Sequence, residues 1–160
     1  MSYFEDPTLD NPFWRFSLDR YTRPGVATTC LEMQERVGID VNLLLFAFWL
    51  GQEERRVTHD LVALDAVAEW HETVVRPLRH ARVARRPASG QHEDPIRSAI
   101  KLLELQAEQI EQALLYRHAK NLATVTGSEA HTDMMHNAQR LIPALAVEGD
   151  ALRRLASLCL

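Results

Sequence analysis

The sequence contains little of what builds strands, hairpins or cross-links. Only six of its 160 residues are glycine, and no sustained stretch alternates apolar and polar residues, so half-buried strands are not expected. The only two cysteines, Cys30 and Cys159, lie far apart and lack the spacing of a metal site or a disulfide framework. We therefore expect reduced, packed thiols and a cytoplasmic location.

Long apolar runs are also missing. The longest run, residues 41–50, is interrupted by Asn42 and is about half the length of a membrane span, which needs about twenty residues. The acidic start of the chain has no apolar segment of the kind found in a secretory signal. These absences predict a soluble protein with no membrane partner.

Helix-forming residues, by contrast, are abundant. The chain has 22 leucines and 19 alanines, about a quarter of all residues, and its apolar residues recur at spacings of three and four. Apolar residues make up 46% of the chain and charged residues 25%, which is typical of a globular protein. We predict an all-α, compact single domain over residues 1–160, with five to seven helices, a flexible N-terminus at 1–10 and an internal linker loop at 87–95.

Capping residues predict where the first helices begin and end. Asn11 followed by Pro12 is a favourable helix start, and Gly38 is a favourable stop for a second helix over about 26–37. We expect Leu31 and Met33 of that second helix to face the core. Asp40 then caps the run 41–50, which is apolar almost all round and is predicted to be the central buried helix.

Later helices are predicted from their apolar spacing. A helix from about residue 59 carries His71 on its apolar stripe and is kinked or broken at Pro77. Further helices are expected at about 95–122, from Ser128, and at 151–158. The stripe predicted to be buried in the long helix is Ile96, Ile100, Leu103, Ala107, Ile110 and Leu114. The final segment, 151–160, either packs within the chain or forms a homo-oligomer contact.

Motifs for metal, cofactor and catalytic chemistry are missing from the sequence. No Glu-x-x-His pair of a di-metal bundle occurs, and His71-Glu72 has no second histidine at zinc-hydrolase spacing. We therefore expect no metal ligands, no cofactor and no catalytic residue. Three acidic residues, Glu104, Glu108 and Glu111, share one helix face. They are either acid–base or cation-binding groups or a solvated stripe paired with Lys101, and we interpret them as the solvated stripe.

His71 and several aromatic residues define one candidate site. A partly buried imidazole can exchange a proton near neutral pH, although a histidine on an apolar stripe is usually a core residue. The aromatic residues either pack the first helix against the central one or line a pocket. The pocket hypothesis, for a small ligand-binding protein or enzyme, names Trp14, Tyr21, Trp49, Trp70 and His71.

The segment 76–86 is the most distinctive charged feature, because it holds five arginines and no acidic residue in a chain of net charge −4. Such a patch can bind the acidic face of a protein or the phosphates of RNA or DNA. A solvated helix end paired within the chain is the third interpretation. The leading functional hypothesis is a non-enzymatic interaction or adaptor protein with a protein partner, and the alternative is a nucleic-acid-binding accessory factor. Nucleic acid would bind Arg76, Arg79, Arg82, Arg85 and Arg86, and a protein partner would bind either these arginines or an exposed apolar groove.

Four motifs in the first 80 residues resemble one known family. They are Asn-Pro-Phe-Trp-Arg-Phe-Ser from residue 11, Asp-Val-Asn-Leu-Leu-Leu-Phe from residue 40, Trp-Leu-Gly from residue 49 and Val-Val-Arg-Pro-Leu-Arg from residue 74. Together they resemble an uncharacterised family of short proteobacterial conserved hypothetical proteins, a domain of unknown function, over about residues 11–125. The resemblance implies a bacterial, cytoplasmic origin and assigns no functional residue.

Overall fold

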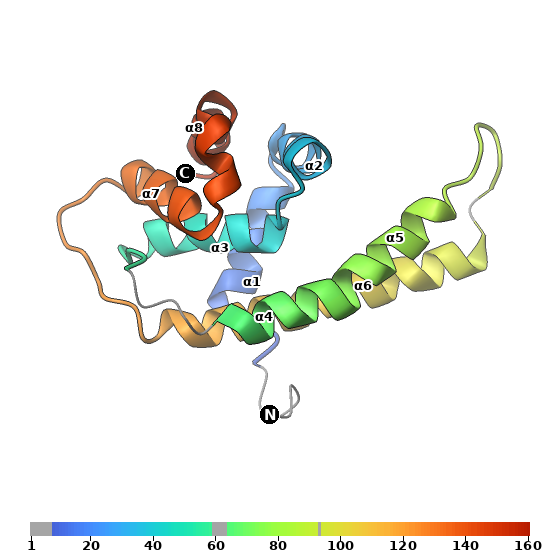
Figure 1. Cartoon of the computed structure of the whole chain (residues 1–160), viewed down its shortest axis with the longest axis horizontal. Coiled ribbons are helices and arrows are strands. Elements are labelled where there is room, and N and C mark those ends of the chain that lie inside the picture. The colour runs from blue at the N-terminus through green and yellow to red at the C-terminus, as the bar shows by residue number, and fades with distance from the viewer. Residues whose placement is uncertain (1–7, 59–63, 93) are drawn as a thin grey trace.

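The structure is a computed structural model that describes residues 8–58, 64–92 and 94–160 (Figure 1). The regular elements of these residues are all helices, and the one bridge, between Arg55 and Thr124, is isolated. The all-α prediction is confirmed. The start of the predicted fourth helix, 59–63, and residues 1–7 of the predicted flexible N-terminus lie outside the described residues.

The helices follow the predicted order along the chain. Helix α4, the π-turn η2 and helix α5 form one continuous helix, so the described residues contain seven helices, within the predicted five to seven. A short 3₁₀ element, η3, lies between α7 and α8. The elements are α1 (Pro12–Tyr21), α2 (Val26–Val37), α3 (Val41–Gln52), α4 (Asp65–Trp70), η2 (His71–Val75), α5 (Arg76–Ala84), α6 (Pro95–Ala119), α7 (Ala130–Leu141), η3 (Pro143–Val147) and α8 (Gly149–Leu158).

Local capping chemistry sets the early helix ends. The Asn11 side chain accepts the Trp14 backbone N–H at 2.9 Å, so it satisfies one of the free donors of α1. Asp40 does the same for α3, and Asp94 for α6, where the Arg97 N–H lies 2.7 Å away. Gly38 ends α2 with φ of 72°, a left-handed conformation that favours glycine. These boundaries match the predicted ones.

Helix α3 is the centre of the core, as predicted. Its residues 44–51 are all buried, and α1, α6 and α7 pack against it (Figure 1). The ring of Phe13 on α1 lies 5.4 Å from Phe46 and 5.5 Å from Trp49, which confirms that aromatic side chains join the first helix to the third. At Gly51 an added Cβ would lie 2.5 Å from the Met134 backbone nitrogen, so α3 and α7 can pack this closely only with glycine there.

Pro77 widens its helix instead of breaking it. Proline has no N–H for the carbonyl four residues earlier, and its ring crowds that carbonyl. The preceding turn, η2, is a π-turn in which the Arg76 N–H donates to the His71 carbonyl five residues back. The helix therefore continues to Ala84, and the predicted break does not occur.

Helices α5 and α6 form a long hairpin that extends away from the other helices (Figure 1). The connection between these two helices includes most of the predicted linker at 87–95. The linker therefore joins the two helices of the hairpin. The apolar stripe predicted for the long helix is wrong in its first half, because Ile96 and Leu103 are 56% and 51% exposed. This part of α6 pairs with α5 in the protruding hairpin, and the core begins further along the helix, near Ala107.

The C-terminal segment packs within the same chain. Leu152 and Leu155 of α8 are fully buried, and the buried Arg20 of α1 donates to the Cys159 carbonyl at 2.7 Å. Burial raises the pKa of the Cys30 thiol to about 12 and that of Cys159 to about 11, so both are free and protonated at neutral pH. No helix of the described residues is both long and apolar enough to cross a membrane.

Candidate functional site

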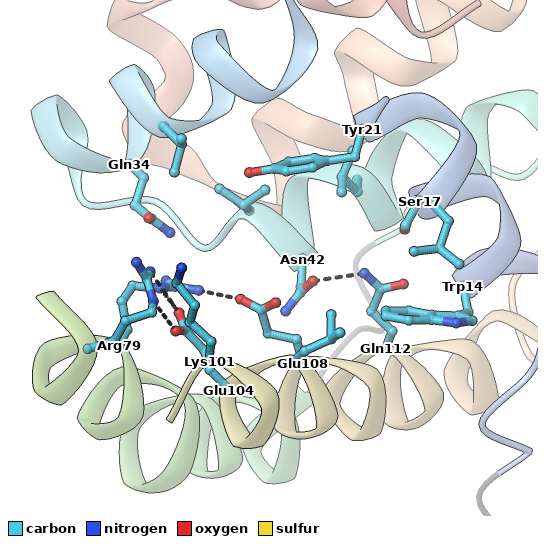
Figure 2. Close-up of a pocket in the computed structure, with 16 residues that line it drawn as sticks. Trp14, Ser17, Tyr21, Gln34, Asn42, Arg79, Lys101, Glu104, Glu108 and Gln112 are labelled. Atoms are coloured by element: carbon cyan, nitrogen blue, oxygen red, sulfur yellow. Dashed lines mark hydrogen bonds and ion pairs between the residues drawn. The ribbon is translucent and has the colours of Figure 1, made fainter. Parts of the chain in front are cut away.

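A cleft of about 400 Å³ lies between the α5–α6 hairpin on one side and α1, α2 and α3 on the other (Figure 2). Helix α6 supplies Glu104, Glu108 and Gln112, which are four residues apart and therefore project from one face of the helix. The opposite wall carries Leu18 and Tyr21 of α1. The cleft thus has a polar face from α6 and a more apolar face from the first three helices.

Ion pairs fill one end of the cleft. Arg79 on α5 donates to Glu104 at 3.1 Å and to Glu108 at 2.7 Å, and Arg82, one turn later, makes a bidentate pair with Glu104. Glu104 is only 5% exposed. The interpretation of Glu104, Glu108 and Glu111 as a solvated stripe is therefore wrong, because α5 and α3 pack over this face of α6.

Uncharged polar groups line the other end. Asn42 on α3 accepts a hydrogen bond from the Gln112 side-chain N–H at 2.8 Å, and both residues are buried (Figure 2). The side-chain oxygen of Gln112, Oε1, has no hydrogen-bond partner. The hydroxyl of Ser17 on α1 also has none. Ser17 and Gln112 are 4% and 2% exposed, so bulk water has little access to either side chain. Both residues line the cleft, close to Trp14.

The exposed apolar residues of α1 and α2 belong to this cleft. Leu31 was predicted to face the core beside Met33, but it is 46% exposed and lines the cleft, while Met33 is fully buried. Leu18 is 48% exposed in the same wall. Burial raises the pKa of Tyr21, also in this wall, to about 12, so its hydroxyl stays protonated and can donate a hydrogen bond at neutral pH.

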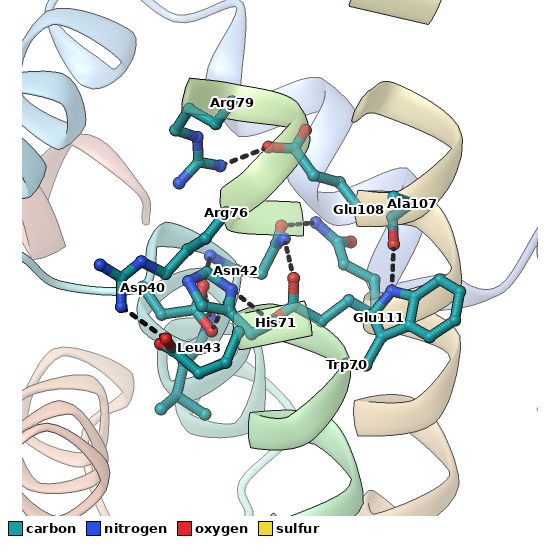
Figure 3. A network of polar contacts seen from close by, with 12 residues as sticks. Asp40, Asn42, Leu43, Trp70, His71, Arg76, Arg79, Ala107, Glu108 and Glu111 are labelled. Atoms are coloured by element: carbon teal, nitrogen blue, oxygen red, sulfur yellow. Dashed lines mark hydrogen bonds and ion pairs between the residues drawn. The ribbon is translucent and has the colours of Figure 1, made fainter. Parts of the chain in front are cut away.

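A second polar cluster lies behind Asn42, where α3, η2 and α6 meet (Figure 3). The Nδ1 atom of His71 lies 3.0 Å from Glu111 Oε1 and 3.3 Å from Asp40 Oδ2. Glu111 is fully buried, and its other oxygen accepts the Asn42 side-chain N–H at 2.8 Å. Next to His71, the Trp70 indole donates to the Ala107 carbonyl at 2.9 Å and so fixes this helix against α6.

Two neighbouring carboxyl groups in this cluster have perturbed pKa values. Burial raises the pKa of Asp40 well above its usual range, and the charge of Glu111 raises it further. Burial also raises the pKa of Glu111, against the hydrogen bonds that lower it. The two carboxyl groups lie close together on either side of His71, and their mutual repulsion adds to the effect of burial.

The residues of the predicted pocket are only partly brought together. Trp14 and Tyr21 line the cleft. Trp49 instead lies in the aromatic core, Trp70 is bound to the α6 backbone, and His71 is in the cluster behind the cleft.

The five arginines of 76–86 lie along α5 and the turn after it. In the described residues four of them contact carboxylates: Arg79 and Arg82 as above, Arg76 with Glu72, and Arg85 with Asp94. Arg86 is exposed at the start of the loop. The binding hypotheses for this patch stay predictions.

Sequence reasoning did not single out Asn42 or Gln112 as site residues, and it assigned Asp40 only the role of a helix cap. It considered Glu104 and Glu111 as cation-binding groups but interpreted them as part of a solvated stripe. One signal was available: Glu111 lies four residues after Ala107 and three before Leu114, so it falls on the apolar stripe. A carboxylate in such a position is buried and needs a partner.

Comparison with known proteins shows the family. A model of the family described as "Protein of unknown function (DUF2390)" matches residues 12–115. The chain belongs to this family. The match confirms the resemblance to a domain of unknown function, and it contains every residue of the cleft and of the cluster behind it. No curated protein and no solved structure matches the chain.

Proposed function

We propose that the cleft binds a small, nearly uncharged molecule with an apolar body and at least one O–H or N–H donor. The observation that carries this proposal is the pair of buried polar atoms without a partner, Ser17 Oγ and Gln112 Oε1, in the same end of one cleft. Leaving a buried polar group without a hydrogen bond costs about 1–3 kcal/mol, so a ligand that supplies the missing bond would gain affinity from it.

The chemistry of the ligand follows from the cleft walls. Gln112 Oε1 is an acceptor and requires a donor, while the Ser17 hydroxyl can donate or accept. Arg79 and Arg82 are already paired with carboxylates, which disfavours a strongly anionic ligand. The leucine side chains and Trp14 favour an aromatic or aliphatic body. The volume lies in the range of small-molecule sites, roughly 300–1,000 Å³.

Paired probes test this proposal. Indole and indene have the same bicyclic shape, but only indole has an N–H donor; phenol and toluene form a similar pair with an O–H. We expect saturable binding, followed by isothermal titration and by shifts of backbone amide signals in α1 and α6, with each donor-bearing probe about 10-fold tighter than its partner.

One variant and its matched control test whether Gln112 accepts the hydrogen bond from the ligand's donor. Gln112→Met removes the acceptor at similar volume and should abolish the preference for indole over indene. Gln106→Met, on an exposed position of the same helix, is the matched control and should leave it unchanged. If no probe binds saturably, or if Gln112→Met retains the preference, the proposal is refuted.

The hypothesis of a protein or nucleic-acid partner at the arginines of 76–86 has less support. A partner of Arg79 or Arg82 would have to displace Glu104 and Glu108, whereas Arg86 and the exposed Leu102 lie on the protruding hairpin. Nucleic-acid binding there would weaken steeply with salt and would be lost on replacing the arginines by glutamate.

A further inference from the structure

The cluster behind the cleft brings three potential metal ligands to one point. Asp40 comes from the start of α3, His71 from the π-turn η2, and Glu111 from α6, and one ligand atom of each lies within 4.8 Å of the other two. Figure 3 shows the imidazole between the two carboxylates. The described residues contain no other such group, and this one is largely buried.

The two distances from His71 Nδ1 to the carboxylate oxygens are compatible with ligands that share one cation. Two atoms bound at about 2.1 Å, with an angle between about 90° and 109° at the metal, lie about 3.0–3.4 Å apart. His71 Nδ1 is 3.0 Å from Glu111 Oε1 and 3.3 Å from Asp40 Oδ2. Small shifts of the side chains would therefore place a cation between them.

In each carboxylate, one oxygen accepts hydrogen bonds from neighbouring N–H groups and the other oxygen faces the centre of the cluster. Asp40 Oδ1 accepts the backbone N–H groups of Asn42 and Leu43, and Glu111 Oε2 accepts the Asn42 side-chain N–H. Hydrogen bonds of this kind orient the ligands of metal sites. The oxygens that are not held in this way, Asp40 Oδ2 and Glu111 Oε1, are the two that face His71.

We propose that Asp40, His71 and Glu111 bind one divalent first-row transition metal ion, of the Zn²⁺, Fe²⁺ or Mn²⁺ type. One imidazole with two carboxylates suits these ions better than Ca²⁺ or Mg²⁺, which take oxygen ligands alone. Three protein ligands leave at least one position for water or another ligand.

The site is independent of the proposed small-molecule ligand, since none of its three ligand residues lines the cleft. Asn42 connects the two, because it bonds Glu111 on one side and Gln112 on the other.

Titration of chelator-treated protein with Zn²⁺ and Co²⁺ tests the site. We expect one equivalent of Zn²⁺ by native mass spectrometry and isothermal titration, and a visible Co²⁺ absorption band typical of four- or five-coordinate nitrogen and oxygen ligation. Asp40→Asn keeps a good helix cap and Glu111→Gln keeps an acceptor for Asn42, so both variants are expected to fold. Each should lower Zn²⁺ affinity by at least about 100-fold and abolish the Co²⁺ band.

Controls separate this site from binding by other histidines. His131→Gln removes a half-buried imidazole outside the cluster, and Glu72→Gln removes the exposed carboxylate next to His71. Both variants should retain one tight equivalent of Zn²⁺ and the Co²⁺ band. Circular dichroism checks the fold of every variant, and His71→Gln replaces either carboxylate variant that does not fold. The proposal is overturned if the wild-type protein binds no Zn²⁺ or if Asp40→Asn and Glu111→Gln bind it as tightly as wild type. If the wild-type protein binds Zn²⁺ but none of the four probes saturably, only the small-molecule proposal is refuted.

Discussion

Replacing Ser17 by alanine should stabilise the protein, which is the opposite of what most substitutions of a buried residue do. Ser17 is 4% exposed and its hydroxyl has no hydrogen-bond partner, so removing the hydroxyl relieves a desolvation cost of about 1–3 kcal/mol. Alanine also has a higher helix propensity than serine, worth about 0.5 kcal/mol inside α1. Loss of the contacts of one oxygen atom offsets about 0.5 kcal/mol of this gain.

The net expectation for Ser17→Ala is an increase of about 1–3 kcal/mol in the free energy of unfolding. For a chain of this size that corresponds to a rise of roughly 2–12 °C in the midpoint of thermal unfolding. Urea unfolding followed by circular dichroism measures the change, and an unchanged slope with denaturant shows that the variant alters stability alone.

Ser157→Ala is the matched control for this prediction. Ser157 also lies in a helix, but its hydroxyl is exposed and donates to the Arg153 carbonyl, so we expect a change within about 0.5 kcal/mol. If Ser17→Ala leaves the free energy of unfolding unchanged or lowers it, the Ser17 hydroxyl is satisfied in the folded protein. The main argument for a ligand in the cleft would then fail. If Ser17→Ala is more stable than the wild-type protein but binds phenol more weakly, the serine lowers stability and contributes to binding.

Three further substitutions or reactions test other parts of the structure. Gly51→Ala should lower the free energy of unfolding in urea by at least about 2 kcal/mol, because the added Cβ would clash with the α7 backbone. The energy of this clash exceeds the gain from the higher helix propensity of alanine. An unchanged midpoint would contradict the close approach of α3 and α7. Glu104→Gln should lower the free energy of unfolding by about 2–3 kcal/mol, because it removes a carboxylate that pairs with two partly buried arginines. Glu72→Gln removes a carboxylate from an exposed pair and should change this free energy by no more than about 0.5 kcal/mol. Equal effects of the two substitutions would refute the argument from burial. Cys30 and Cys159 should not react with a thiol reagent at mildly alkaline pH until the protein unfolds, because their raised pKa values keep both protonated and burial blocks access; rapid reaction of the native protein would contradict this.

The fold class and most helix ends follow from the sequence, because they depend on neighbouring residues. Asn11, Asp40 and Gly38 act on backbone groups within three or four residues, so their effects can be read locally. The burial of α3 is also readable, since a helix that is apolar on all sides has no face for water.

The site depends on contacts between residues far apart in the chain, which the sequence does not specify. Asn42 interrupts an apolar run, and only packing of α3 on α6 places its side chain between Glu111 and Gln112, about 70 residues later. Glu104 has the spacing of a solvated stripe, and it is buried because the hairpin brings Arg79 and Arg82 over it. Sequence periodicity fixes which face of a helix a residue occupies, but the tertiary structure decides whether that face meets water, a guanidinium or another carboxylate.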